Sequence, residues 1–307
     1  MAIQRIKRDD RETWLALRQK YIGGSDAASV VGLNEYQSPY ALWAEKTGKA
    51  PPFEGNLRTE VGTYLEPFIA KQFEKETGKK VQNCNFSLIN DKYPWAIADI
   101  DRVVIGEDAI LEIKSTSALN LKHYKNGDYP ARFYVQCQHY LAVTEKDKAY
   151  LAVLIGNGDF RTFEIQRDED EIKALMDAEK DFYDYMTSNE ELPASPADVN
   201  SIEITHPVSN GTSIELFGTQ NIMRDYLEIK AKIALLEKEA DGIAAALKQD
   251  MGDAEKGTDG QYVVTWANRS KTSFDKKAFQ KDNPGINLSK WEKTTNYRAF
   301  SIKKLEV

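Results

Sequence analysis

The sequence of 307 residues has only two cysteines and three histidines. Cys84 and Cys137 lie far apart, outside any zinc, iron–sulfur or redox spacing. This scarcity argues against a structural zinc site and favours a reducing, cytoplasmic compartment. The chain also lacks an apolar run near the roughly 20 residues that a membrane span requires, and MAIQRIKRDDRE contains no apolar signal core. We therefore expect no export signal and no membrane partner.

The chain also lacks an excess of positive charge, since its formal net charge is -7. The acidity is local, since residues 151–200 hold four Lys or Arg against 13 Asp or Glu. Nucleic-acid binding depends on local patches and on metal sites rather than on the overall sign. The net charge thus excludes no function on DNA.

Along the first 190 residues, helix signals come first and are followed by three strands, a helix, two strands and a final helix. Capping residues and apolar spacing predict helices over 9–21 (capped by Asp9 or Asp10), 25–32, 38–48, 57–77, 131–144 and 168–188. Apolar runs bounded by turn residues predict strands over 80–89, 95–105, 109–115, 149–155 and 160–166. This order predicts an α/β or α+β fold with one central mixed sheet flanked by helices.

The remainder of the chain predicts an appendage. We expect a main domain over 1–192, a linker over 193–218 and a C-terminal part over 219–307. The last part begins with a long helix or with a helical hairpin broken at Gly242, followed by strand-like pieces at 261–268 and 296–302. A long helix with an apolar stripe suits self-association or partner docking, but the chemistry of this part stays open.

Two charges interrupt the apolar strand AILEIKS. Glu112 and Lys114 lie two residues apart and therefore share one face of the strand. If Gly106 opens a two-residue turn, Asp101 falls directly opposite Glu112. Two carboxylates so placed repel unless a cation lies between them, and Mg²⁺ or Mn²⁺ suits such oxygens better than Lys114 does. The alternative is a hairpin whose charges are merely solvated.

A second candidate site precedes the first. Ser25 follows Gly23 and Gly24 at the start of a short predicted helix, where free N–H groups favour a phosphate. Arg18 of the preceding helix is placed to clamp the same phosphate. The residues alone favour the alternative, an ordinary Ser cap with a solvated Arg, over a phosphate site.

Four elements, in this order along the chain, resemble those of one nuclease superfamily. Gly62 to Glu66 resembles its GxxxE element, and Gln136 to Tyr140 resembles its QxxxY element. Between them, Asp101 resembles the D and Glu112-Ile113-Lys114 the ExK of its D…ExK core. The chain resembles the PD-(D/E)XK nucleases, and within them the YqaJ-type viral recombinases and phage lambda-exonuclease-like enzymes, over about residues 10–190.

The resemblance implies a restriction-endonuclease-like core and a metal-dependent 5′-to-3′ exonuclease that leaves 3′ single strands. It implies two Mg²⁺ ions, replaceable by Mn²⁺, on Asp101, Glu112, the Ile113 carbonyl and Glu66. Lys114 and Gln136 would complete the catalytic set, with Tyr140 beside them. Here Asp99 is a rival to Asp101, although the hairpin register favours Asp101.

The resemblance also implies contacts beyond the metal site. Trp14, Arg18 and Ser25 match the family arrangement whose Arg and Ser contact the DNA 5′-phosphate, although Trp14 is of a type more often found in a core. The implied setting is a homotrimeric ring on double-stranded DNA ends in a bacterial host, working with a single-strand annealing protein of phage-type recombination. An endonuclease of the same superfamily and an inactive DNA-binding assembly factor are the alternatives.

Overall fold

A computed structural model describes residues 2–8, 10–188 and 190–304 of the chain. The fold divides into two compact units, Met1–His206 and Pro207–Val307, which are considered separately below. Within those described ranges, no helix combines the length and the apolar character needed to cross a membrane.

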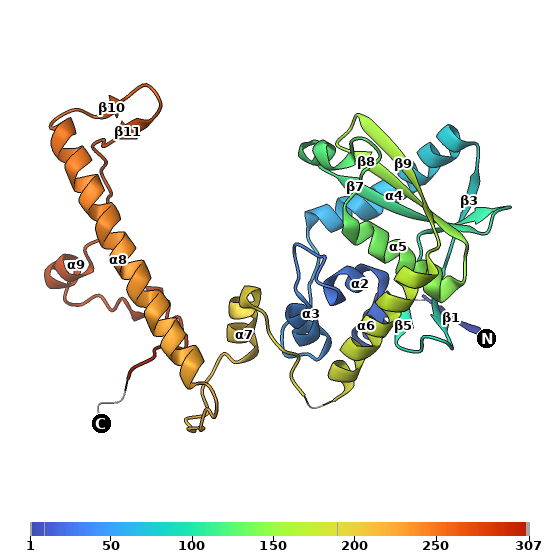
Figure 1. The fold of residues 1–307 in the computed structure, drawn as a ribbon, viewed down its shortest axis with the longest axis horizontal. Coiled ribbons are helices and arrows are strands. Elements are labelled where there is room, and N and C mark those ends of the chain that lie inside the picture. Colours follow the sequence, from blue (N-terminus) through green and yellow to red (C-terminus); the bar gives the residue numbers. More distant parts are fainter. Residues whose placement is uncertain (1, 9, 189, 305–307) are drawn as a thin grey trace. The chain divides into compact units, whose positions relative to one another are not determined.

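The first unit is built on a five-stranded mixed sheet in the order β3-β6-β7-β8-β9 (Figure 1). Its strands are β3 (Lys80–Asn83), β6 (Arg102–Ile105), β7 (Ala109–Thr116), β8 (Lys148–Ile155) and β9 (Asp159–Gln166). β7 and β8 run parallel, whereas the other neighbouring strands run antiparallel. The predicted fold class, a central mixed sheet flanked by helices, is confirmed.

Two predicted strands are wrong in extent because each is divided between two sheets. Residues 80–89 form β3 and then β4 (Phe86–Asn90), which pairs with an unforeseen β1 (Ile3–Lys7). Residues 95–105 form β5 (Ala96–Ile97), which pairs with β2 (Ile22–Gly23), and then β6. Apolar runs indicate strand conformation but carry no information on where a strand changes partners.

The predicted helices of this unit are confirmed with small shifts at their ends. They are α1 (Arg11–Lys20), α2 (Gly24–Val30), α3 (Pro39–Lys46), α4 (Leu57–Thr77), α5 (Ala131–Thr144) and α6 (Glu169–Thr187), with a 3-10 segment at Ala118–Tyr124. Asp10 caps α1, and Asp9 lies outside the described residues. Gly78 ends α4 in the left-handed conformation, as its glycine predicts.

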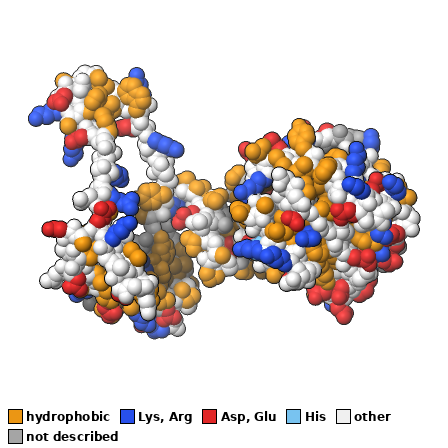
Figure 2. All heavy atoms as spheres, turned by 90° about the horizontal axis from the view of Figure 1, so that it is seen from above, with side chains coloured by type: hydrophobic (Ala, Val, Ile, Leu, Met, Phe, Trp, Pro, Cys, Tyr) orange, Lys and Arg blue, Asp and Glu red, His pale blue; other side chains and the backbone are white. Residues whose placement is uncertain are grey.

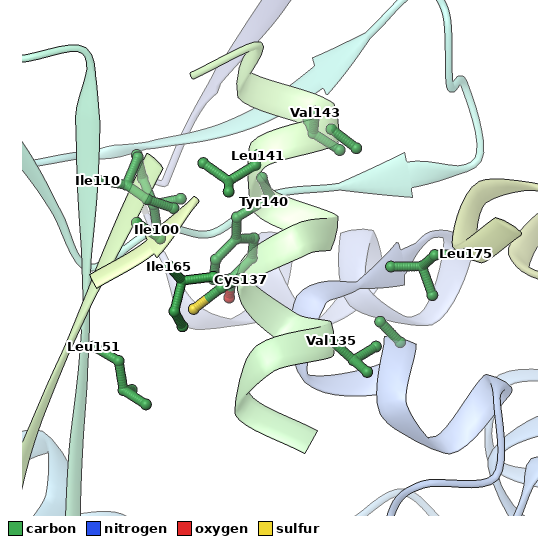
Figure 3. Close-up of a cluster of buried hydrophobic side chains, with 14 of the residues drawn as sticks. Ile100, Ile110, Val135, Cys137, Tyr140, Leu141, Val143, Leu151, Ile165 and Leu175 are labelled. Atoms are coloured by element: carbon green, nitrogen blue, oxygen red, sulfur yellow. The ribbon is translucent and has the colours of Figure 1, made fainter. Parts of the chain in front are cut away.

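Helices cover both faces of the sheet. Ile69 and Phe73 of α4 pack against Leu111 and Ile113 on one face. On the other face, α5 buries Leu141 and its apolar neighbours against β7, β8 and β9 (Figure 3). Because successive residues of a strand point to opposite faces, Glu112 belongs to the α5 side. The alternation of β7 therefore sends its two charged side chains toward α5.

Phe73 anchors α4 on the sheet and sets the first prediction. Its side chain is fully buried against Tyr150, with ring centroids 5.4 Å apart. We expect Phe73→Ala to lower the free energy of unfolding by about 3–5 kcal/mol, because it removes buried area and leaves a cavity. Phe68→Ala, on the same helix but 55% exposed, is the matched control and should change little. Urea denaturation measures both, and equal losses would contradict this packing.

The turn of the β6–β7 hairpin carries an ion cluster. Gly106 has a φ of 83°, which a glycine adopts without strain. The following Glu107 pairs with Lys79 and accepts hydrogen bonds from Tyr150 Oη at 2.8 Å, and Lys148 Nζ lies 3.3 Å away. Hydrogen bonding to Lys79, then to Tyr150, lowers the pKa of Glu107 to about 2.

This lowered pKa predicts a pH dependence of stability. The folded pKa of about 2 lies below the ordinary value of 4.5, so folding favours the carboxylate. The stabilising contribution of Glu107 is therefore complete above pH 4.5 and disappears as the pH falls toward 2. Unfolding midpoints of the protein and its Glu107→Gln variant should differ at neutral pH and converge on acidification. A difference that stays constant down to pH 2 would contradict the cluster.

The region predicted as a linker contains the short helix α7 (Val199–Thr205) after a 3-10 turn at Pro196–Asp198. Asp198 is buried and accepts a hydrogen bond from Ser38, the N-cap of α3. This contact attaches the first part of the region to the first unit.

The second unit is dominated by α8 (Gln220–Met251), an unbroken helix of 32 residues. The predicted long helix is thus confirmed, and the alternative, a helical hairpin broken at Gly242, is wrong. β10 (Lys256–Thr258) pairs with β11 (Val263–Thr265), followed by α9 (Lys276–Asp282) and a 3-10 turn at Ser289–Trp291. The strand predicted over 296–302 is wrong, because these residues join no strand.

Candidate active site

The β6–β7 hairpin has the register that places Asp101 opposite Glu112. Arg102 pairs with Leu111 and Val103 with Ile110, so the next residues outward face each other. Asp101 Oδ2 accepts a hydrogen bond from the Ile113 N–H at 2.8 Å, which fixes the carboxylate on β7. The juxtaposition that the turn chemistry predicts is therefore present.

Glu112 is 2% exposed and lies between two side chains. Its Oε1 accepts from Lys114 Nζ at 2.6 Å and from Gln136 Nε2 at 2.7 Å. Gln136 Nε2 also donates to Tyr140 Oη at 3.1 Å, one helical turn further along α5. The predicted Gln136 thus reaches the strand and holds the predicted Tyr140 beside it, because residues four apart lie on the same helix face.

The other carboxylate oxygen, Glu112 Oε2, is buried and accepts no hydrogen bond from any residue that the structure describes. A buried unpartnered carboxylate oxygen is costly, because nothing replaces its hydration. A divalent cation with hard oxygen ligands would satisfy it. The oxygen chemistry of this pair therefore fits the predicted magnesium site.

The pKa shifts of Asp101 and Glu112 indicate that a further positive charge would stabilise their ionised forms. Burial raises the pKa of Asp101 well above its usual value, and the neighbouring Glu112 raises it further. Burial also raises the pKa of Glu112, although Lys114 opposes this effect. Strongly perturbed carboxylates beside a cleft are typical of functional sites.

Glu66 stands apart from this pair. It is paired with the buried Arg102, whose Nη1 also donates to the Asp101 carbonyl at 2.7 Å. Across residues 2–8, 10–188 and 190–304, no three His, Cys, Asp or Glu side chains converge closely enough to hold a metal ion. Glu66 lines a polar cavity of about 290 Å³ together with Arg8, Asp101 and Arg102. It is near enough to raise the pKa of both Asp101 and Glu112.

Asp99 has other partners and does not reach Ile113. Its Oδ2 accepts from the Trp14 indole at 2.8 Å, and its Oδ1 accepts from the Ser87 hydroxyl. Trp14 is therefore a half-buried hydrogen-bond donor rather than a core residue. The backbone between Ile97 and Arg102 leaves strand geometry, which separates two residues that a regular strand would hold on one face.

The predicted phosphate-binding residues contact each other. Arg18 Nη2 donates to the exposed Ser25 hydroxyl at 2.7 Å and lies 3.1 Å from Asp26 Oδ1. Ser25 does not cap α2, because Gly23 is the N-cap. The Gly23 N–H donates a hydrogen bond to Asp26 Oδ2 at 2.9 Å. The reading of Ser25 as an ordinary cap is thus wrong. Arg18 and Trp14 line a cavity of about 840 Å³ between α1 and the start of α4.

A buried ion pair holds Arg18 in place. Lys46 Nζ lies 2.6 Å from Asp26 Oδ2, opposite the oxygen that faces Arg18. Burial raises the pKa of Asp26, but Lys46 and Arg18 outweigh it, and the pKa is lowered overall. The sequence does carry a signal for Asp26, because it lies three residues after the N-cap Gly23, where an acidic side chain can bond the N-cap N–H. Lys46 and Arg102 carry no sequence signal, because their partners are distant in the chain.

Gly24 connects the two sites by close packing. A Cβ at this position would lie 2.3 Å from the Tyr140 ring, so only glycine fits. His139, the neighbour of Tyr140, is fully buried between Glu179 at 2.7 Å and the Ile97 carbonyl at 3.0 Å. These contacts make His139 a packed, hydrogen-bonded residue of α5.

These features define an α/β protein whose mixed sheet carries two facing carboxylates and a lysine at a hairpin, with a Gln and a Tyr from the covering helix. Residues 13–147 match the model of the YqaJ-like viral recombinase domain. The uncharacterized protein YqaJ of Bacillus subtilis is 36% identical over 303 residues, covering 96% of this chain and 95% of that protein. The chain belongs to the YqaJ-like viral recombinase family.

Solved structures show weaker similarity. The alkaline exonuclease LHK-Exo of Laribacter hongkongensis matches with a TM-score of 0.49 and 20% identity, over 57% of this chain and 92% of that one. A phage-related exonuclease of Haemophilus somnus matches with a TM-score of 0.42 and 18% identity, over 53% and 93%.

Proposed function

We propose that this protein is a metal-dependent deoxyribonuclease that digests linear double-stranded DNA from 5′ to 3′. The observation that carries the proposal is the facing pair Asp101 and Glu112, buried beside Lys114, with one Glu112 oxygen left unpartnered. Membership in a viral recombinase family supports a role on DNA. The 3′ single strand left behind would enter phage-type recombination by strand annealing.

The oxygen donors on the hairpin suit Mg²⁺, with Mn²⁺ as a substitute. Asp101, Glu112 and the Ile113 carbonyl would hold one ion, and Glu66 would serve a second after exchanging its contact with Arg102. When bound, such ions supply an activated water and stabilise the leaving oxygen of a phosphodiester. Because Glu66 is already paired with Arg102, we expect the second ion to bind less tightly than the first.

The protein's own side chains supply the remaining chemistry. Lys114 Nζ, held 2.6 Å from Glu112 Oε1, presents a positive charge where a phosphate would approach and steers the attacking water. Gln136 bridges Glu112 and Tyr140, so it fixes the carboxylate orientation and can turn its amide toward the phosphate. These groups position reactants on a rigid sheet and helix, which favours catalysis by orientation.

Recognition of the DNA end is assigned to Arg18 and Ser25. A guanidinium and a hydroxyl 2.7 Å apart beside a cavity of about 840 Å³ form a suitable contact for a terminal phosphate. Lys46 neutralises Asp26 behind them, so the acid does not repel the phosphate. This arrangement favours digestion that starts at a 5′-phosphate. From the resemblance to the lambda-exonuclease-like enzymes, we propose that the protein works as a homotrimeric ring, with a single-strand annealing protein as partner, inside a bacterial host.

Comparison of linear with covalently closed DNA tests the proposal. With Mg²⁺, linear duplex carrying 5′-phosphates should lose its 5′-ended strands as mononucleotides and leave 3′ single strands, and closed circles of the same sequence should persist. A chelator should stop the reaction, and Mn²⁺ should restore it. Cutting of closed circles would instead support the endonuclease alternative, and inertness toward both substrates would support a DNA-binding factor.

A further inference from the structure

The C-terminal unit presents large aromatic side chains to solvent. No residue among 207–304, all of which the structure describes, is buried, although aromatic rings ordinarily dominate the core of a folded unit. Within residues 261–304, six rings are 48–82% exposed, and these are Tyr262, Trp266, Phe274, Trp291, Tyr297 and Phe300. Figure 2 shows hydrophobic side chains and Lys or Arg side chains on the surface of this unit. The rings are therefore accessible to a ligand.

The same segment carries the positive charge that the rest of the chain lacks. Residues 261–304 hold ten Lys or Arg against three Asp or Glu, a balance of +7. Residues 1–260 hold 31 Lys or Arg against 44 Asp or Glu, a balance of -13. A basic segment on an otherwise acidic chain is the electrostatic footprint of a polyanion-binding surface.

Lysines lie directly beside two of the rings. Lys290 Nζ lies 4.1 Å from the centre of the Trp291 ring, and Lys248 Nζ, near the end of α8, lies 5.8 Å from that of Trp266. The two tryptophans nevertheless remain 66% and 48% exposed, respectively. Proteins bind single-stranded nucleic acid with this combination, because bases stack on aromatic rings while cations follow the phosphates.

Two other polyanionic surfaces suit this segment less well. Duplex DNA presents base edges in its grooves, so its bases offer no free faces to cover exposed rings. A membrane surface is commonly bound by an amphipathic helix of some length, with a basic face and an apolar face. The α-helix of this segment, α9, has only seven residues. The observations therefore favour a single strand.

We propose that residues 261–304 bind single-stranded DNA, with bases stacked on the exposed rings and phosphates beside the lysines. The choice of DNA follows from membership in a viral recombinase family. The inference goes beyond the proposed digestion and rests on it for the source of the strand, which is the 3′-ended strand left behind. Binding at this segment holds that strand on the protein while its complement is removed.

Loss of the rings tests the stacking. The affinity of the full-length protein for a fluorescent oligothymidylate is measured by anisotropy with divalent cations chelated, so that digestion does not interfere. The double variant Trp291→Ala, Tyr297→Ala should bind roughly 30-fold or more weakly, because it removes two stacking platforms. The ring-retaining double variant Trp291→Phe, Tyr297→Phe should bind nearly as tightly as the unaltered protein. Equal affinities of the two double variants would overturn the proposal.

Phe217→Ala controls for the loss of an exposed ring elsewhere in this unit. Phe217 is 84% exposed, close to the 82% of Tyr297, but it precedes α8 and lies outside the basic segment. Its removal should leave the affinity for the oligothymidylate unchanged. A loss equal to that of Tyr297→Ala would show that binding does not depend on residues 261–304, which would overturn the assignment.

The salt dependence of binding tests the phosphate contacts. Lys293→Gln should reduce the slope of log affinity against log salt concentration by about 0.7, the value for one phosphate contact on a single strand. Lys238→Gln removes the same charge from an exposed position on α8, outside the segment, and should leave the slope unchanged. Equal slopes for the two variants would contradict a backbone contact by this segment.

Competition identifies the ligand and separates this proposal from the nuclease proposal. Unlabelled single-stranded DNA should displace the oligothymidylate, whereas closed circular duplex and vesicles containing phosphatidylserine should displace it far less effectively. Equal displacement by duplex or by vesicles would overturn the choice of a single strand. Because binding is measured without metal, a protein that binds here but digests no DNA would refute only the nuclease proposal. A protein that digests DNA while its ring variants bind unchanged would refute only this one.

Discussion

Replacing Glu112 by Gln is expected to reduce the turnover of linear DNA by roughly 10³-fold or more. Gln retains the size of Glu and still accepts the hydrogen bonds of Lys114 and Gln136, but it cannot supply an anionic ligand. The folded state should remain intact, because the substitution removes a buried charge whose second oxygen has no hydrogen-bond partner within the described residues. Initial rates with saturating Mg²⁺ and the thermal midpoint without metal measure the two effects.

Glu164→Gln provides the matched control for this loss. Glu164 lies on β9 of the same sheet, with its side chain 46% exposed beside Lys148. The control should digest DNA at the unaltered rate. If Glu112→Gln retains activity within about threefold of the starting protein, catalysis does not depend on this carboxylate. The hairpin site would then be structural.

Arg18→Ala should remove the preference for phosphorylated ends. The guanidinium is the charged group at the proposed phosphate contact, and a hydrogen bond to a charged group contributes about 1.5–3 kcal/mol. Digestion of 5′-phosphorylated duplex should slow by roughly 10- to 100-fold. Duplex ending in a 5′-hydroxyl should be digested at nearly the starting rate, so the ratio of the two rates should approach one.

Arg11→Ala distinguishes end recognition from general attraction of DNA. Arg11 lies on the same helix and lines the same cavity, but it is exposed and stands about two helical turns before Arg18. Its loss should slow both substrates equally and preserve their ratio. An Arg18→Ala enzyme that still prefers the 5′-phosphate would show that the end is recognised elsewhere. The pocket itself should persist in that variant, because Lys46 still pairs with Asp26.

Local rules predicted the elements that hold the site. Gly106 at the turn sets the hairpin register, and that register alone places Asp101 opposite Glu112. Gln136 and Tyr140 were indicated by the resemblance to the QxxxY element, and their four-residue spacing puts both on one face of α5, from which Gln136 reaches β7. Turn geometry and helical periodicity depend on neighbouring residues, so the sequence reveals them.

The features that the sequence does not reveal all depend on contacts between residues far apart in the chain. Asp99 and Asp101 resemble each other in sequence, and their partners distinguish them in the structure: Trp14 and Ser87 bind Asp99, whereas the Ile113 N–H binds Asp101. Arg102 appears as an ordinary strand residue until α4 places Glu66 against it. The division of residues 80–89 between two sheets is set by β1, which lies more than 70 residues earlier. No local pattern encodes such pairings.

Digestion of an end-labelled duplex tests the central claim most directly. A linear duplex with 5′-phosphates and different labels on its 5′ and 3′ termini is incubated with Mg²⁺ and either the protein or its Glu112→Gln variant. We predict early release of the 5′ label as mononucleotide, a persistent 3′-ended strand, and no release by the variant. Release of the 3′ label first, internal fragments, or equal digestion by Glu112→Gln would contradict the account.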